Sequence, residues 1–195
     1  MSERASLRAE FEKRAKIQSE MTFQGKTIAV RTDRIEMAGL PPQRWDIVLH
    51  PGAVVIVPVA DDGKIVLIKQ WRRAISEITV ELPAGTLDQK NEEVAKCAQR
   101  ELQEEIGFRA EEIIPLGGFY SAPGFCNEFL HLFIGKSLKP DPLPHDVDEA
   151  IDLYPVSLDE AFKLIDDGTI HDAKTVAGIF RYERWLKQTH GKKKY

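Results

Sequence analysis

Three glutamates gather in the second half of one predicted helix. The spacing of apolar residues predicts a helix over residues 92–106. Glu101 and Glu105 are four residues apart, so they are neighbours on its surface, where like charges repel by about 0.2–0.5 kcal/mol. Glu104 adds a third carboxylate in the half of the helix where the dipole disfavours anions. Because this pattern opposes stability, we interpret the three residues as functional.

Three convergent carboxylates would form a site for a hard cation. Mg²⁺ prefers octahedral oxygen ligands and usually keeps several waters, which leaves positions open to a substrate phosphate. The alternative is an acidic face that is simply solvated, and this is the more common role of a Glu-rich helix. The glutamates lie off the apolar stripe that we expect to face the core, which consists of Ala95, Ala98, Leu102 and Ile106.

The composition excludes several classes of protein. The chain has 195 residues, enough for one domain with a small appendage, and its net charge of −4 argues against nucleic acid as a partner. No apolar run approaches the roughly 18 residues of a membrane span, so no membrane partner is expected. The first residues lack the apolar core of a secretory signal, and two cysteines, Cys97 and Cys126, are too few for a disulfide scaffold. We therefore expect a cytoplasmic protein.

Around the acidic helix, the sequence pattern predicts two parts. Residues 1–50 contain a charged helix followed by three strands, and this N-terminal β unit is too small to have its own core. Strands with few helices between them predict an α+β sandwich for residues 51–195. In this second part we expect a hairpin around Asp61-Asp62-Gly63, strands near 77–82, 113–120, 129–135 and 150–156, a helix over 157–166 capped by Ser157 and Glu160, and a helix over 172–187.

Residues 85–108 carry the most specific motif of the chain. Read from Gly85, they follow the pattern G-x6-E-x7-R-E-U-x-E-E-x-G-U, where U is an apolar residue. This pattern resembles the Nudix box, G-x5-E-x7-R-E-U-x-E-E-x-G-U. The one departure is an extra residue between Gly85 and Glu92, which we place in the loop 88–91 and which affects the loop rather than the helix.

The resemblance implies a fold, a reaction and roles for the motif residues. Members of the Nudix family are α/β/α sandwiches that bind divalent cations and hydrolyse a nucleoside diphosphate linked to another group. By position, Glu101 and Glu105 look like direct metal ligands, and Glu104 looks like a ligand through water or to an additional ion, with a part in catalysis. The backbone carbonyl of Ala84 would complete the metal site. The remaining pair, Glu92 and Arg100, looks like the ion pair that fixes the loop of the box.

Three features outside the box resemble the ADP-ribose pyrophosphatase subfamily. They are the entry segment 81–85 (ELPAG), Pro123 sixteen residues after Gly107, and the distal segment 148–175. The resemblance implies conversion of ADP-ribose and water to AMP and ribose 5-phosphate, with Mg²⁺, or Mn²⁺ as an alternative. It places Arg72 against substrate phosphate or ribose, since a guanidinium can donate two parallel hydrogen bonds to phosphate oxygens. The other implied substrate contacts are Arg73, Glu81 and Pro123.

Two further expectations rest on the same resemblance. The general base is expected in the acidic loop 145–149, where Glu149 is our first choice and Asp148 our second. In relatives a small N-terminal unit exchanges across a two-fold axis, which implies a homodimer. Phe23 and Trp45 then pack in the interface or against the adenine.

The sequence leaves alternative functions open. A hydrolase of GDP-mannose or another nucleotide sugar would use the same metal site, and so would an enzyme of broad specificity. A non-catalytic ADP-ribose-binding module would be expected to have lost one of the three glutamates, and none is lost. An enzyme acting on RNA ends would favour a basic surface, whereas this chain is acidic.

Overall fold

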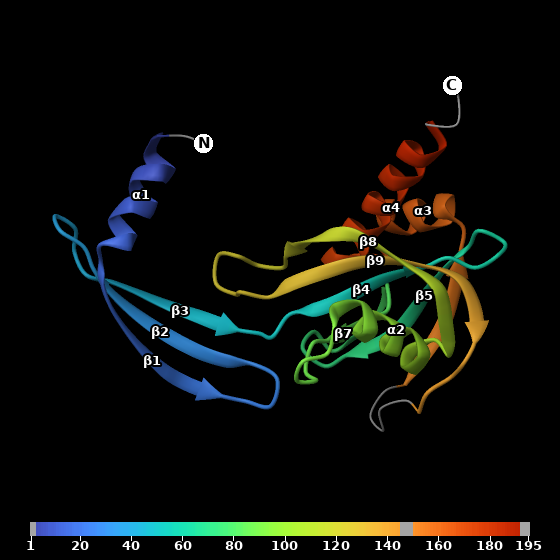
Figure 1. The fold of residues 1–195 in the computed structure, drawn as a ribbon, viewed down its shortest axis with the longest axis horizontal. Coiled ribbons are helices and arrows are strands. Elements are labelled where there is room, and N and C mark those ends of the chain that lie inside the picture. The colour runs from blue at the N-terminus through green and yellow to red at the C-terminus, as the bar shows by residue number, and fades with distance from the viewer. Residues whose placement is uncertain (1–2, 145–149, 192–195) are drawn as a thin grey trace. The chain divides into compact units, whose positions relative to one another are not determined.

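The computed structural model describes residues 3–144 and 150–191. Contacts between residues divide the chain into two units (Figure 1). The first unit combines Met1–Pro51 with Ala122–Glu128, and the second combines Gly52–Ser121 with Phe129–Tyr195. Each unit therefore contains segments that are distant in sequence.

The first unit is a three-stranded antiparallel sheet in the order β1-β2-β3, preceded by one helix. The loop 122–128 joins this sheet along β3, because the N–H of Val48 donates to the carbonyl of Phe125 (2.7 Å) and the N–H of Asn127 donates to the carbonyl of Val48 (3.1 Å). The three predicted strands are thus present. The elements of this unit are α1 (Glu3–Lys13), β1 (Lys16–Gln24), β2 (Ala29–Glu36) and β3 (Gln43–Leu49).

One face of this sheet exposes large apolar side chains. Ile17 and Met21 of β1 and Trp45 of β3 all pair with residues of β2, and these β2 partners are separated by even numbers of positions. Side chains at such positions point to the same side of a sheet, so Ile17, Met21 and Trp45 share one face. Their exposed fractions are 49%, 52% and 44%. A row of half-exposed large side chains on one sheet face is typical of an interaction surface.

The second unit contains two sheets. One has four strands in the order β7-β4-β9-β8, in which β4 and β9 run parallel, and the other has three antiparallel strands in the order β10-β5-β6. The elements are β4 (Ala53–Pro58), β5 (Ile65–Arg72), β6 (Glu77–Glu81), β7 (Ala84–Thr86), α2 (Val94–Glu105), β8 (Phe108–Tyr120), β9 (Phe129–Pro140), β10 (Ile151–Val156), α3 (Leu158–Asp166) and α4 (Ala173–Gly191).

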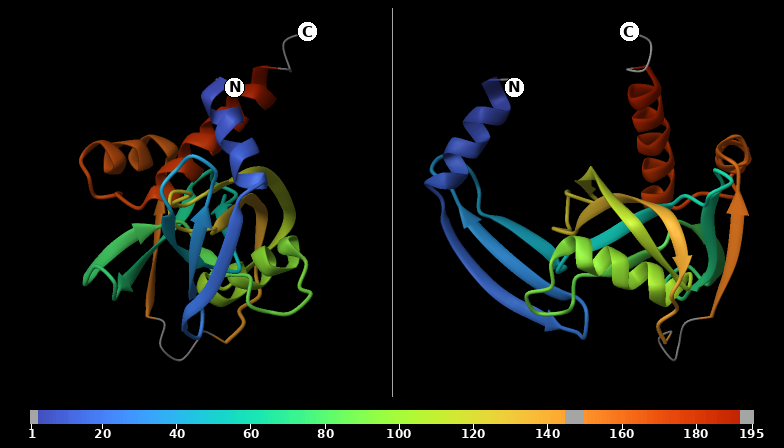
Figure 2. Two further views of the ribbon diagram at one scale, coloured as in Figure 1. Left: turned by 90° about the vertical axis from the view of Figure 1, so that its left-hand side faces the viewer. Right: turned by 45° about the vertical axis from the view of Figure 1, so that its right-hand side comes forward.

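Helices cover both faces of the four-stranded sheet. Side chains of β4 alternate between two cores, since Val54 and Ile56 pack in the cluster that contains Leu102 of α2, whereas Val55 packs in the cluster that contains Ile179 of α4. Figure 1 shows α2 on one side of β4 and β9, with α3 and α4 on the other, and the right-hand view of Figure 2 shows the same arrangement. The predicted α+β sandwich is confirmed.

The predicted hairpin around residues 61–63 is wrong. The turn itself is present, because the N–H of Ala60 donates to the carbonyl of Lys64 (2.9 Å). Beyond an isolated bridge between Val59 and Ile65, however, β4 and β5 enter different sheets. Each strand is an interior strand with a partner on both edges, which explains why all of β4 and the first half of β5 are apolar and buried.

The buried face of α2 differs from the predicted stripe. Ala95 is exposed, whereas Glu101 and Glu105 are buried, with exposed fractions of 8% and 3%. The difference arises because β7 lies beside the glutamate-bearing side of the helix and covers it. The other three predicted core residues are buried: Ala98, Leu102 and Ile106.

The helices on the opposite face begin near the predicted residues. At the start of α3, the N–H of Glu160 donates to the Ser157 hydroxyl (3.2 Å), and the N–H of Ser157 donates to the Glu160 carboxylate (2.8 Å), which confirms the predicted capping box. Within residues 3–144 and 150–191, no helix has both the length and the apolar character needed to cross a membrane.

Candidate active site

Strand β7 places the backbone of Ala84 and Gly85 directly against two glutamates of α2. The N–H of Ala84 donates a hydrogen bond to Oε2 of Glu105 (2.9 Å). A Cβ atom added to Gly85 would lie 1.8 Å from Cδ of Glu101, so this carboxylate occupies the space that a side chain would need. Glycine at this position therefore creates the cradle that holds the Glu101 carboxylate beside the strand.

Arg100 connects the other acidic side chains of the motif. Its Nε and Nη2 atoms donate to the two carboxylate oxygens of Glu92, each at 3.0 Å, in a bidentate pair. Its Nη1 atom lies 2.7 Å from oxygens of both Glu101 and Glu104. Hydrogen bonding from Arg100 lowers the pKa of Glu92, and the Glu92 carboxylate in turn raises the pKa of Arg100. The pair joins the loop of the motif to its helix.

Cys97 is a buried residue in contact with Arg100. Its side chain is fully buried, and Nη2 of Arg100 lies 3.4 Å from its sulfur. Burial, with a smaller contribution from the charge of Glu101, raises the pKa of the thiol to about 12. The thiol is therefore protonated at neutral pH and acts as a small packing residue.

The donor atoms around β7 and α2 fit a hard divalent cation. Carboxylate oxygens of Glu101 and Glu105 and backbone carbonyl oxygen are the ligand types that such ions prefer. As the side chains are placed, no three His, Cys, Asp or Glu residues of the described part of the chain form a group that would hold a metal ion. Glu101 and Glu104 instead contact Arg100, so a cation would compete with this guanidinium for their oxygens.

A second cluster of charged residues surrounds Glu81 at the end of β6. Nε and Nη2 of Arg72 donate to the two oxygens of Glu81 at 2.7 Å and 2.5 Å. The hydroxyl of Thr79 and the ammonium of Lys174 also donate to this carboxylate. Burial acts to raise the pKa of Glu81, but the hydrogen bonds and charges of its partners outweigh it and lower the pKa to about 2. Glu81 is therefore an anion whose two oxygens are both occupied.

Arg72 belongs to the Glu81 cluster and also interacts electrostatically with the acidic helix. The hydrogen bonds that Arg72 donates to Glu81 raise the pKa of Arg72, and the negative charges of Glu105 and Asp172 add to this effect. Its side chain is 36% exposed, and its two hydrogen bonds to Glu81 use only Nε and Nη2. Arg72 therefore keeps donors available to an anionic ligand.

Comparison with known proteins decides the family. Residues 49–178 match the family model described as NUDIX domain, which covers more than half of the chain. The chain belongs to the Nudix hydrolase family. Members of this family generally use divalent metal ions, in agreement with the ligand types around β7 and α2.

Individual Nudix relatives are similar over most of the chain. The ADP-ribose pyrophosphatase of Bacillus subtilis is 37% identical over 165 residues, which cover 84% of this chain and 89% of that protein. The methanol dehydrogenase activator of Bacillus methanolicus is 36% identical over the same shares of the two chains. A crystal structure of an ADP compounds hydrolase matches the fold with a TM-score of 0.81 at 24% identity, over 90% of this chain and 95% of that one.

The predicted site residues that have not yet been located in this Nudix chain are Arg73, Pro123, Glu149 and Asp148. Arg73 is exposed after β5 and forms no ion pair with a described residue. Pro123 is exposed in the loop 122–128, which belongs to the first unit, whereas the acidic helix belongs to the second. Glu149 and Asp148 fall outside the described residues, so the predicted general base stays a prediction.

Lys174 and Thr79 belong to the Glu81 cluster, but the sequence analysis did not select them. Lys174 is 93 residues from Glu81 along the chain, and no local pattern relates the two. The one available signal was the distal segment 148–175, which the resemblance marked as a whole without singling out Lys174.

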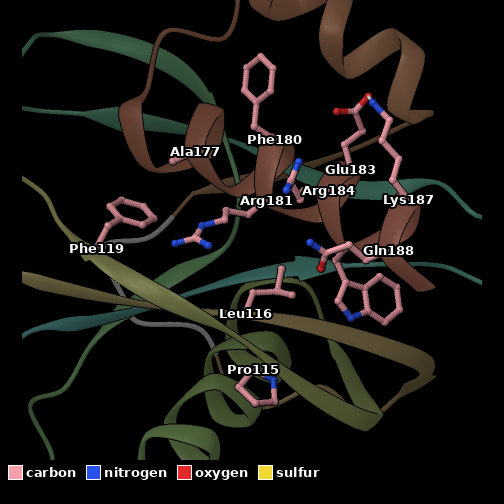
Figure 3. A pocket seen from close by; sticks show the side chains of 11 residues that line it. Pro115, Leu116, Phe119, Ala177, Phe180, Arg181, Glu183, Arg184, Lys187 and Gln188 are labelled. Atoms are coloured by element: carbon pink, nitrogen blue, oxygen red, sulfur yellow. Dashed lines mark hydrogen bonds and ion pairs between the residues drawn. The ribbon is translucent and has the colours of Figure 1, made fainter. Parts of the chain in front are cut away.

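A separate hollow lies between β8 and α4 (Figure 3). Its volume is about 790 Å³, and its lining includes Leu116, Phe119, Phe180, Arg181 and Arg184. None of the residues of the acidic motif or of the Glu81 cluster lines it. The hollow is therefore distinct from the candidate active site.

Proposed function

We propose that this Nudix hydrolase cleaves the pyrophosphate of a nucleoside diphosphate sugar, and that ADP-ribose is converted to AMP and ribose 5-phosphate. The observation that carries this proposal is the complete acidic cluster on α2, held against β7 by the Ala84–Glu105 hydrogen bond and the Gly85 cradle. The choice of ADP-ribose is supported by the 37% identity to an ADP-ribose pyrophosphatase over 84% of the chain.

We assign the divalent cation as Mg²⁺, with Mn²⁺ as an alternative. Glu101, Glu105 and the carbonyl of Ala84 would hold it directly, and Glu104 would act through water or on an additional ion. When bound, the cation neutralises the pyrophosphate and lowers the pKa of a coordinated water. Arg100 would keep its bidentate contact with Glu92, so the loop would stay fixed to the helix while Glu101 and Glu104 served as ligands.

The other residues act on the substrate itself. Arg72 donates to phosphate oxygens through the guanidinium atoms that Glu81 does not use, and Arg73 is a second candidate for the same charge. Pro123 is proposed to shape the sugar or nucleoside site. Glu149 is proposed as the base that takes the proton from the attacking water, with Asp148 as the second candidate.

The active molecule is proposed to be a homodimer in the cytoplasm. Support for the dimer comes from the sheet of the first unit, where Ile17, Met21 and Trp45 expose about half of their surfaces on one face. Burying such side chains against a second copy would be favourable by about 25 cal/mol per Å² of apolar surface. The cytoplasmic assignment is supported by the free thiols of Cys97 and Cys126.

A substrate panel tests this function. Purified full-length protein is incubated with ADP-ribose, GDP-mannose and diadenosine polyphosphates, with Mg²⁺ or with EDTA, and the products are separated by chromatography. We expect Mg²⁺-dependent release of AMP from ADP-ribose at the highest kcat/KM of the panel. Faster turnover of GDP-mannose would show that GDP-mannose, and not ADP-ribose, is the preferred substrate. Inactivity on every diphosphate in the presence of both Mg²⁺ and Mn²⁺ would refute the enzyme assignment.

A further inference from the structure

Lys174 lies in the first turn of α4, and its ammonium reaches the carboxylate of Glu81 on β6. The ammonium also donates to Oδ2 of Asp172 (3.0 Å), the same oxygen that accepts from the N–H of Thr175 (3.0 Å) at the start of the helix. The side chain of Lys174 is 14% exposed. Two of its three donor hydrogens are thus used by carboxylates of the protein, which leaves little of this ammonium for a ligand.

The start of α4 is fixed against the end of β6. The N–H of Leu82 donates to the hydroxyl of Thr175 (2.8 Å), and Thr175 is fully buried. At Gly178, one helical turn later, an added Cβ would lie 2.4 Å from Cδ1 of Leu82, so helix and strand are in close contact there. Lys174 therefore contacts Glu81 from a helix end that is packed against the strand.

Glu81 connects Lys174 to Arg72, because its carboxylate accepts hydrogen bonds from both. Its carboxylate is 2% exposed and binds Arg72 through both oxygens, so the plane of the carboxylate sets the plane of the guanidinium. Lys174 donates to Oε2, the oxygen that also accepts from Nη2 of Arg72. If this ammonium is removed, a buried carboxylate loses a charged donor, and the half-exposed guanidinium is the partner that can move to compensate.

We propose that Lys174 is a positioning residue, which through Glu81 holds the Arg72 guanidinium in the orientation that binds the substrate pyrophosphate. The proposal rests on the proposed function for its ligand. It assigns Glu81 a supporting role beneath Arg72 in place of the direct substrate contact that the sequence resemblance implied.

Steady-state kinetics test the positioning role. With ADP-ribose and saturating Mg²⁺, we expect Lys174→Met to raise KM about tenfold while kcat changes by less than about threefold, because binding of the pyrophosphate is weakened and the acidic helix is intact. Lys174→Arg keeps a cation at this position and should bring KM back to within about threefold of the unchanged protein. The matched control is Lys187→Met, the same substitution at an exposed position of α4, which should leave both constants unchanged.

A double variant separates positioning from an independent contact. If Lys174 acts through Arg72, then Lys174→Met should add less than about twofold to the KM of Arg72→Ala, because interacting residues are not additive. Multiplication of the two effects would overturn the proposal, since it would mean that Lys174 acts without Arg72. A KM of Lys174→Met within about twofold of the unchanged protein would overturn it as well.

An NMR measurement tests the positioning role of Lys174 independently of enzymatic activity. The Nε–H of Arg72 is hydrogen-bonded to Glu81 and should give a resolved ¹H–¹⁵N signal, identified by its absence in Arg72→Lys. We expect this signal to shift or broaden in Lys174→Met and to return in Lys174→Arg. An unchanged signal in Lys174→Met would refute the positioning role even if the protein hydrolyses ADP-ribose. Should the unchanged protein hydrolyse no diphosphate, the proposed function fails and this signal alone decides the role of Lys174.

Discussion

The backbone N–H of Ala84 donates to the carboxylate of Glu105 across a distance of 2.9 Å. This hydrogen bond joins the short strand β7 to the last turn of α2, two elements that are separated by the whole loop of the motif. It brings together two residues that we propose as metal ligands. Because the bond uses a backbone donor, the position of Glu105 depends on the path of the strand rather than on the side chain of residue 84.

Removing the charge of Glu105 should abolish turnover and preserve the fold. Glu105→Gln keeps the shape of the side chain and a carbonyl oxygen that can accept from Ala84, but it removes the anionic ligand. We expect kcat to fall by at least about 100-fold, with a change in melting temperature of only a few degrees. The assay is Mg²⁺-dependent AMP release, with thermal unfolding measured in parallel. Activity within about tenfold of the unchanged protein would show that the metal assignment is wrong.

A methyl group at position 85 should displace Glu101. In Gly85→Ala the new Cβ would overlap the Glu101 carboxylate, which lies 1.8 Å from that point, so the carboxylate must leave its cradle. We expect the Mg²⁺ concentration for half-maximal activity to rise about tenfold or more, which a metal titration measures.

Gly168→Ala is the control for a general loss of stability. Gly168 has a positive φ of 82° and open space around its Cα, so alanine there should cost about 1 kcal/mol of unfolding free energy through backbone strain. The metal titration of this control should match that of the unchanged protein. An unaltered metal titration in Gly85→Ala would contradict the proposed role of Glu101.

The local elements could be predicted from sequence because their signals are local. The helical period of residues 92–106, the capping residues Ser157 and Glu160, and the alternating strands of the first unit each occupy a short stretch of chain. The acidic pattern on α2 also identified Glu101, Glu104 and Glu105, since repulsion between neighbouring charges is visible in the spacing alone.

Features that depend on distant segments could not be predicted in this way. The turn at residues 61–63 predicted a hairpin, but β4 and β5 find their partners in β9 and β10, far along the chain. Ala95 was expected in the core, but β7 covers the side of α2 that carries the glutamates. The contact of Lys174 with Glu81 likewise exists only because α4 packs against β6.

Acid should remove the stability that Glu81 provides. Its folded-state pKa is about 2, below the ordinary value of 4.5, so its contribution is complete above pH 4.5 and is lost as the pH falls toward 2. We expect Glu81→Gln to lower the free energy of unfolding by about 3 kcal/mol at pH 7 and by progressively less between pH 4.5 and pH 2.5. Urea titrations at several pH values measure this difference.

The exposed residue Glu111 provides the control for this pH series. It forms no ion pair with a described residue, so Glu111→Gln should change the free energy of unfolding by less than about 0.5 kcal/mol at pH 7. A gap between the unchanged protein and Glu81→Gln that stays constant from pH 7 to pH 2.5 would contradict the assigned ion pairs, because the gap would then come from packing alone.

Charge placed on the apolar face of the first unit should weaken the proposed dimer. Ile17 and Met21 lie on the face shared with Trp45, and lysine at both positions would place two charges in a surface that we expect to be buried against a second copy. Analytical ultracentrifugation should show a dimer for the unchanged protein and a dissociation constant raised at least about 100-fold in the double variant.

The neighbouring residue Gln18 supplies the matched control for the dimer. It points to the opposite face of β1, so Gln18→Lys adds charge to the same strand without entering the apolar surface. We expect this variant to remain dimeric. A monomer in the unchanged protein at micromolar concentration would refute the dimer, and equal weakening by Gln18→Lys would show that the contact does not use the face of Ile17, Met21 and Trp45.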